Sequence, residues 1–273
     1  MEQLNKRQSQ SGAALIIFVT LLVLAITSLF LSQINVDKLQ IATQKQTASV
    51  LAQAKEALLG FALTYAETHP GEQAGYLPCP DKDGDGSADT PCSTTAYSVI
   101  GRFPWRTLGL PPLRDGSGEC LWYAVSGTYK DNPKQILTKT TKGLFIVKNI
   151  NGDNLSSGTI AIIFAPGKLL DDQNTRARTD NTFCGDNIEI TDYLDDLEID
   201  ADGDGVSDYT IKNFSGEKTD ETSGNPGGEK LPTATASVFI KASLIKDYNN
   251  RTIFNDSLML ITPKDFQPIY ERM

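Results

Sequence analysis

The apolar residues of this chain are concentrated near its N-terminus. Residues 13–34, AALIIFVTLLVLAITSLFLSQI, contain no charged side chain, and a helix that crosses a bilayer needs about 20 such residues. A polar leader, residues 1–12, precedes this stretch and carries Lys6 and Arg7. Because basic residues stay on the cytoplasmic side of a membrane, the pattern predicts a transmembrane segment at 13–34 with the rest of the chain outside the cytoplasm.

Helical periodicity continues beyond the apolar stretch. Residues 35–46 are mostly polar but contain no Gly or Pro. Apolar residues then recur at spacings of three and four, at Leu51, Ala54, Leu58, Phe61 and Tyr65. The sequence His69-Pro70-Gly71 is a typical helix stop. We therefore expect one helix from Ala13 to about Thr68, whose amphipathic half, residues 35–69, packs on a sheet. A separate shorter helix after a membrane anchor is the alternative, because Gly60 lies within the run.

After Pro70 the pattern changes to short β-rich stretches separated by turn residues. The expected strands lie at residues 144–150, 159–165, 238–245 and 257–261. A polar, Gly-rich stretch, residues 215–235, is expected to be a long surface loop. The predicted fold class is α+β: a long N-terminal transmembrane and amphipathic helix packed on one antiparallel-sheet domain, residues 70–273.

Composition narrows the possible functions. The chain has 273 residues, a formal net charge of -9 and a pI near 4.7, which argues against a nucleic-acid partner, because such binding depends on basic phosphate contacts. The chain has one histidine, His69, so a multi-histidine zinc site is excluded.

Four cysteines, Cys79, Cys92, Cys120 and Cys184, all follow the apolar stretch. An extracytoplasmic compartment allows disulfides to persist. Four cysteines can pair in three ways, and the sequence does not select one. We favour Cys79 with Cys92, which closes a short loop around an acidic motif, and Cys120 with Cys184. Free thiols are the alternative.

An acidic motif, D-x-D-G-D-G-x-x-D, occurs twice, at residues 81–89 and 200–208. Carboxylates at alternate positions, followed by a glycine for the sharp turn, let one short loop wrap several oxygen atoms around a hard cation such as calcium. The spacing resembles the calcium loops of EF-hands, thrombospondin type 3 repeats and dockerins. The candidate ligands are Asp81, Asp83, Asp85, Asp89, Asp200, Asp202, Asp204 and Asp208. Solvated Asp-Gly turns are the alternative.

Neither motif is a complete EF-hand loop. The twelfth position, where an EF-hand supplies a bidentate glutamate, is Cys92 in the first motif and Ile211 in the second. The missing ligand must therefore come from elsewhere. Further acidic donors lie near the second motif, at Asp192, Asp195, Asp196 and Glu198.

The leader Lys6-Arg7-Gln8-Ser9-Gln10-Ser11-Gly12, followed by Ala13-Ala14-Leu15-Ile16-Ile17, resembles the class III leader of type IV pilins and type II secretion pseudopilins. The resemblance implies that a prepilin peptidase cuts between Gly12 and Ala13 and methylates the new amine. It also implies a single-pass protein of the bacterial inner membrane, with its body in the periplasm or on a surface filament. An uncleaved signal anchor and a cleaved secretory signal are the alternatives.

One residue departs from the usual family pattern. Most members have a glutamate at the fifth mature position, where this chain has Ile17. The same departure is shared by the K-type minor pseudopilin, so the resemblance implies a minor subunit at a filament tip or in priming. Its partners would be other pilin or pseudopilin subunits, contacted through the N-terminal helix.

No catalytic residue is expected, because the sequence contains no P-loop, nucleophile elbow or dinucleotide fingerprint. Trp105 and Trp122 lie in an aromatic stretch that we interpret as core anchors, with an aromatic ligand platform as the alternative. Two functional hypotheses result: a non-enzymatic minor pilin or pseudopilin with calcium-stabilised loops, or a membrane-anchored calcium-dependent adhesion or binding module.

Overall fold

The computed structural model of the chain describes residues 11–32, 36–92, 97–170, 173, 176, 183–184, 190–199, 209–212, 229–231, 238–246 and 251–273. The chain divides into two compact units, Met1–Thr43 and Gln44–Met273. The first unit contains helix α1 and the beginning of α2. The second unit contains the rest of α2 and all the strands named below.

Two N-terminal helices are present where one was expected. Helix α1 runs Ser11–Ser32 and α2 runs Val36–Thr68, so the prediction of a single helix from Ala13 to Thr68 is wrong. Ser32 and Asn35, which flank the junction in the sequence, are weak helix formers because their side chains compete for backbone hydrogen bonds. A separate second helix was the alternative, but Gly60, the residue on which it rested, lies inside α2.

The membrane-spanning part of the predicted fold is also corrected. Among the residues that the structure describes, no helix is both long and apolar enough to cross a membrane. The pilin-like fold with one long transmembrane helix is therefore replaced by an α+β chain with two N-terminal helices and several sheets.

Within the second unit, one side of α2 is buried against the rest of that unit. Its buried residues recur at spacings of three and four: Leu51, Ala54, Leu58, Ala62 and Tyr65. Lys55 Nζ donates hydrogen bonds to Leu260 O at 2.9 Å and to Asp265 Oδ1 at 2.7 Å. The helix ends at Thr68, as the His69-Pro70-Gly71 sequence predicted, and Gly71 has a φ of 89°.

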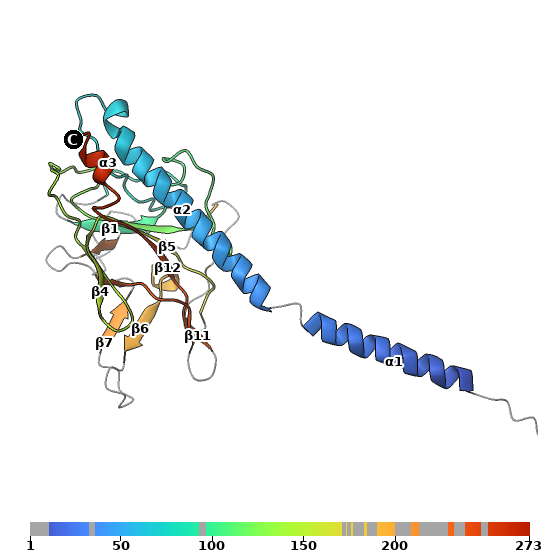
Figure 1. Ribbon diagram of the computed structural model, residues 1–273. Helices are drawn as coiled ribbons and strands as arrows, with labels where there is room; N and C mark the ends of the chain where they lie inside the picture. Colours follow the sequence, from blue (N-terminus) through green and yellow to red (C-terminus); the bar gives the residue numbers. More distant parts are fainter. Residues whose placement is uncertain are drawn as a thin grey trace, which may run out of the picture. The chain divides into compact units, whose positions relative to one another are not determined.

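The central sheet of the second unit has five strands in the order β12-β5-β2-β1-β8. Their bounds are β1 Ser98–Arg102, β2 Trp122–Val125, β5 Ala161–Ala165, β8 Glu229–Leu231 and β12 Ser257–Ile261. All four pairings are antiparallel. Figure 1 shows α2 running beside β1, β5 and β12.

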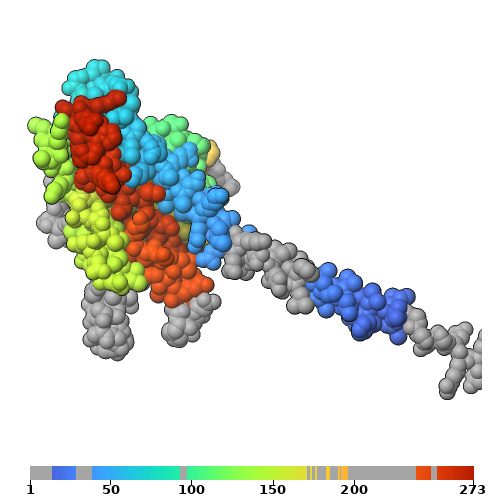
Figure 2. All heavy atoms as spheres, in the orientation of Figure 1, coloured from blue at the N-terminus to red at the C-terminus, as the bar shows by residue number. Residues whose placement is uncertain are grey.

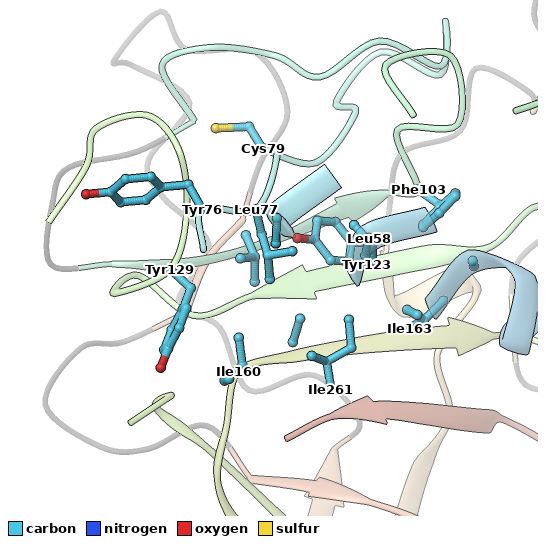
Figure 3. Packing of buried hydrophobic residues seen from close by; sticks show 14 of the residues in the cluster. Leu58, Tyr76, Leu77, Cys79, Phe103, Tyr123, Tyr129, Ile160, Ile163 and Ile261 are labelled. Carbon is cyan, nitrogen blue, oxygen red and sulfur yellow. The ribbon is translucent and has the colours of Figure 1, made fainter. Parts of the chain in front are cut away.

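Both faces of this sheet are covered, because successive side chains of a strand point to opposite faces. On one face Val99, Tyr123, Ile163 and Ile261 join the core cluster that includes Leu58 of α2; Figure 3 shows Tyr123, Ile163 and Ile261 in this cluster with Leu58. On the other face the buried residues are Ile100, Trp122, Ala124, Ile162, Phe164 and Leu258. Covering on both sides explains why β2 and β5 are continuously buried.

A second sheet covers the face opposite α2. It has three strands in the order β4-β3-β9, with bounds β3 Phe145–Lys148, β4 Asn154–Thr159 and β9 Val238–Ile240. Strand β3 pairs antiparallel with β4 and parallel with β9. The ring of Phe239 packs against Phe145 and Phe164, with centroid distances of 5.3 and 5.4 Å. These aromatic contacts join the two sheets.

The remaining elements are short. Two hairpin-like pairs form, β6 Asp196–Ile199 with β7 Tyr209–Lys212 and β10 Ile245–Lys246 with β11 Thr252–Phe254. A 3-10 turn, η1 Ile190–Asp192, and a short helix, α3 Gln267–Tyr270, are the other elements of the described residues. The C-terminal segment, red in Figure 2, lies against the end of α2, and Arg272 Nη1 contacts Glu67 Oε1 of α2 at 3.2 Å.

The strand predictions are confirmed in place but not in extent. Strand β12 matches the predicted range, whereas β3 and β5 are shorter, and the predicted strand 238–245 is replaced by β9 and the beginning of β10. The surface-loop prediction is wrong at residues 229–231, which form β8 against β1. The other residues of that predicted loop lie outside the described part of the chain. The expectation of a purely antiparallel sheet fails at β3 and β9, which pair in parallel.

Trp105 and Trp122 are both buried, so their interpretation as core anchors is confirmed. The Trp122 ring lies under the Arg102 guanidinium, whose Cζ is 4.6 Å from the ring centroid. The same guanidinium is 4.2 Å from the Tyr193 ring. A cation between two aromatic rings of the core attaches the segment around Tyr193 to the end of β1.

Candidate metal centre

The first acidic loop, residues 81–89, is closed at its base by a backbone bridge and a disulfide. Asp81 N donates to Arg102 O at 3.0 Å, and Arg102 N donates to Asp81 O at 2.8 Å. Cys79 and Cys92, on either side of the loop, are joined by a disulfide with their Cα atoms 5.7 Å apart. The loop is therefore attached to β1 and restrained at both ends.

The loop folds around the carboxylate of Asp81, which is fully buried. Its Oδ1 accepts a hydrogen bond from Gly84 N at 2.8 Å and one from Asp83 N at 3.2 Å, and its Oδ2 accepts one from Gly86 N at 2.8 Å. Asp83 and Asp85 repeat the pattern by accepting from the backbone two residues later. These Asx turns are the local reason why alternate aspartates curl the chain.

Glycine is required at position 86. Gly86 has a φ of 90°, in the left-handed region, and a Cβ atom there would overlap the ring of Trp105. Gly86 O accepts a hydrogen bond from Arg106 N at 2.8 Å. The sharp turn of the loop thus fits between its own aspartates and the Trp105 side chain.

Three of the four predicted ligands of this loop converge. One carboxylate oxygen from each of Asp81, Asp83 and Asp89 lies within 4.8 Å of the other two. The side chain of Asp85 instead contacts Arg106, with Oδ2 3.3 Å from Nη1. The structure therefore brings together positions 1, 3 and 9 of the motif and leaves position 5 outside the cluster.

Burial and mutual repulsion act on these carboxyl groups. Burial raises the pKa of Asp81 to about 7, although hydrogen bonds from Gly86 N and Gly84 N oppose the shift. Burial also raises the pKa of Asp89, and the nearby Asp83 adds to that shift. Ionising Asp81 and Asp89 in this loop therefore carries a free-energy cost, which a bound cation would offset.

The donor set fits a hard divalent cation. All the converging atoms are carboxylate oxygens, the ligands that such cations prefer, and Gly86 occupies the sixth position, where calcium loops make their sharp turn. The loop also holds Asp81 ready in a fixed orientation through three backbone hydrogen bonds. Among the described residues, this is the group of acidic side chains that could hold a metal ion.

A neighbouring segment, residues 104–108, supports the loop and was not predicted to do so. Thr107 Oγ1 accepts a hydrogen bond from Ala88 N at 2.7 Å, and the Arg106 guanidinium lies over the Trp105 ring at 5.1 Å. The sequence does show a Trp-Arg-Thr cluster, with hydrogen-bond donors and an aromatic ring. Its contact with the acidic loop could not be predicted, because that contact depends on the pairing of Asp81 with Arg102.

The second acidic loop, with Asp200, Asp202, Asp204 and Asp208, lies outside the described residues. Of its expected extra donors, Asp192 and Asp195 are buried, whereas Asp196 and Glu198 belong to β6 and their side chains are not described. The prediction of a second cation site therefore stays a prediction.

The carboxylate of Asp195 has structural partners. Its Oδ2 accepts from Asn255 N at 2.5 Å and from Asp256 N at 3.1 Å, and its Oδ1 accepts from Gln173 Nε2 at 2.9 Å. In return, Asp256 Oδ2 accepts from Asp195 N at 2.8 Å. This reciprocal pair fastens the beginning of β6 to the turn before β12.

The two expected disulfides are both present. Besides Cys79–Cys92, the structure joins Cys120 to Cys184, with Cα atoms 5.6 Å apart. At the predicted processing site, Gly12 and Ala13 lie in the first turn of α1, which begins at Ser11. Ile17, the fifth residue after the predicted cut, is exposed.

The single histidine takes part in the end of α2. The His69 ring stacks on Tyr65 with a centroid distance of 4.0 Å, and its Nδ1 lies 3.1 Å from Tyr65 O and 3.0 Å from Thr68 Oγ1. These contacts give His69 a role in terminating the helix. That the chain is not an enzyme stays a prediction.

Comparisons with protein-family models, with curated proteins and with solved structures find no match for this chain.

Proposed function

We propose that this chain is a non-enzymatic minor pilin- or pseudopilin-type subunit that primes or caps a filament, and that calcium stiffens its acidic loops. The observation that carries the proposal is the sequence of the leader, which ends in Gly12, together with the apolar helix α1, whose first turn contains Gly12. Processing at this point leaves the apolar helix on the mature chain, which suits a subunit that assembles through that helix.

The exposed side chains of α1 support assembly. Leu15, Phe18 and Leu24 are 67%, 66% and 64% exposed, and contiguous apolar surface of this kind is stabilised when another apolar surface covers it. Other subunits' helices are the proposed cover. Ile17 brings no carboxylate into such a contact, which suits a subunit that has no neighbouring terminal amine to neutralise.

The disulfides support an extracytoplasmic location for the second unit. Cys79–Cys92 and Cys120–Cys184 would be reduced in most cytosols but persist in the periplasm or outside the cell. The inner membrane as the place where the subunit waits before assembly stays a prediction. It is checked by cell fractionation with and without prepilin peptidase.

The experiment that tests the filament proposal is N-terminal sequencing and intact mass of the chain from cells with and without prepilin peptidase. With the peptidase, we expect a mature chain that begins at a methylated Ala13; without it, or with Gly12→Val, residues 1–12 should remain. Gly60→Ala is the matched control, because nothing lies within 4 Å of a Cβ at that position. A chain that keeps its leader despite the peptidase would favour the adhesion or binding module instead, and one that begins after Ile34 would contradict both.

Calcium is the proposed cation because the loop matches positions 1, 3, 6 and 9 of calcium loops and a body outside the cytoplasm meets calcium. Extracellular calcium modules bind with a Kd of roughly 0.1 to 1 mM. Calcium outside the cytoplasm would then keep the site filled. The bound ion would hold the loop 81–89 against the segment 104–108.

Calcium should raise the melting temperature of the oxidised chain. For a Kd near 1 mM, about 10 mM calcium adds about 1.4 kcal/mol to the free energy of unfolding, or about 3–5 °C, relative to the chain in chelator. Scanning calorimetry measures this difference. Asp83→Asn should reduce it, because Asp83 is one of the three converging ligands. Glu67→Gln removes an exposed charge on α2 and should leave it unchanged. An unaltered melting temperature on calcium addition would contradict the proposal.

A further inference from the structure

A fixed positive charge sits beside the acidic loop. Arg106 Nη1 is 3.3 Å from Asp85 Oδ2, and the two side chains are 50% and 48% exposed. Asp85 is the fifth residue of the motif, a position that supplies a ligand in calcium loops. Its carboxylate is nevertheless absent from the converging group of Asp81, Asp83 and Asp89.

The backbone and the guanidinium of Arg106 both have contacts besides the ion pair with Asp85. Arg106 N donates to Gly86 O at 2.8 Å, and the guanidinium lies over the Trp105 ring at 5.1 Å. The next residue, Thr107, is bonded to Ala88 N of the loop. Arg106 is thus tied to the loop by contacts that do not depend on its ion pair, so its charge stays near Asp85.

A second, independent observation is an unpaired buried N–H group beside the loop. Trp105 is 8% exposed, and its Nε1 has no hydrogen-bond acceptor among the residues that the structure describes. This N–H lies against Gly86, where a Cβ atom would approach Nε1 within 2.5 Å. Buried indole N–H groups are normally paired, with ordered water where protein acceptors are lacking. An oxygen of solvent or of a hydrated ligand is therefore the acceptor that we expect for this N–H beside Gly86.

We propose that Arg106 is an internal competitor for the cation at the loop 81–89. The guanidinium and a divalent cation bind the same carboxylate, Asp85, so cation binding releases Asp85 from Arg106 and adds it to the ligand set. This inference rests on the proposed function, because it assumes that the loop takes a divalent cation. Arg106 thereby lowers the affinity of the loop and sets the calcium concentration at which it fills.

The test is calorimetric titration of the oxidised full chain with calcium chloride. Arg106→Gln should tighten the Kd by about two- to fivefold, the range expected when an exposed ion pair no longer competes. Arg272→Gln is the matched control, because Arg272 makes an exposed pair of nearly the same length with Glu67, at 3.2 Å, and should leave the Kd unchanged. A Kd that stays the same or weakens in Arg106→Gln would overturn the competition.

The role of Asp85 is tested separately. In a chain that carries Asp85→Asn, the substitution Arg106→Gln should give no further gain in affinity, because the shared carboxylate is gone. A gain that persists would overturn the exchange at Asp85. If neither the unaltered chain nor Arg272→Gln binds calcium, the proposal that the loop is a cation site is wrong. If both bind calcium and Arg106→Gln binds it with the same Kd, only the competition by Arg106 is wrong. Equal melting temperatures in chelator establish that the variants are folded.

Discussion

Removing the disulfide between Cys120 and Cys184 should lower the free energy of unfolding by about 4 kcal/mol. The two cysteines are 64 residues apart, and a cross-link over a longer loop removes more conformational entropy from the unfolded chain. Both are buried in the core that contains α2, so Cys120→Ala with Cys184→Ala replaces them without adding polar groups. Urea unfolding under non-reducing conditions measures the loss.

The other disulfide provides the control. Cys79 and Cys92 are only 13 residues apart, so their replacement by alanine should cost less, about 3 kcal/mol. Equal losses, or a greater loss for the shorter loop, would contradict the expectation. The Cys120–Cys184 variant should also disturb the acidic loop, because Phe183, next to Cys184, packs on Trp105 with a centroid distance of 5.7 Å and accepts a hydrogen bond from Arg114.

The stability of the chain in chelator should fall as the pH rises from about 4 to 6, and Asp131 should account for up to about 3 kcal/mol of the fall. Burial raises the pKa of Asp131 to about 6, although Cys79 N, Lys134 and His69 oppose the shift. Its Oδ1 is buried with no hydrogen-bond partner among the described residues. The folded chain therefore retains a proton that the unfolded chain has already released, so the contribution of Asp131 to stability is fully present below pH 4 and is lost as the pH rises through 6.

Urea unfolding between pH 4 and pH 8 tests this expectation through Asp131→Asn. The variant should have a flatter pH profile and should be more stable than the unaltered chain above pH 6. Asp153→Asn, at an exposed turn, should keep the original profile. Burial raises the pKa of Asp81 and Asp115 as well, so these groups also contribute to the pH dependence of the unaltered chain. The contribution of Asp131 is therefore the difference between the pH profiles of the unaltered chain and of Asp131→Asn. Parallel profiles would contradict the assignment.

The end of α2 was predictable, whereas its beginning was not. The stop at His69-Pro70-Gly71 is local chemistry, because proline and glycine act on their own backbone. The division into α1 and α2 depends on weak preferences near Ser32 that a motif search does not resolve. Strand β8 was not predicted for a related reason. Glu229–Leu231 has little alternation of apolar and polar residues, and the segment is a strand because it pairs with β1.

The first acidic loop likewise has one part that the sequence predicted and one part that it did not. The alternating aspartates and the glycine at position 86 predicted a turn with converging carboxylates, and Asp81, Asp83 and Asp89 do converge. The diversion of Asp85 to Arg106 was not predicted, because the two residues are 21 positions apart and meet through the bridge between Asp81 and Arg102.

The sequence by itself determined the features that depend on neighbours along the chain: the apolar character of α1, the buried stripe and the end of α2, and the curl of the first acidic loop. Only the tertiary structure decided which side chains meet across long separations, including the order of the central sheet, the support of Gly86 by Trp105 and the pairing of Asp85 with Arg106. The physical reason is that turns and helical periodicity arise from sterics and hydrogen bonds between residues close in the sequence. Contacts between distant residues depend instead on how α2 and the second sheet pack on the two faces of the central sheet.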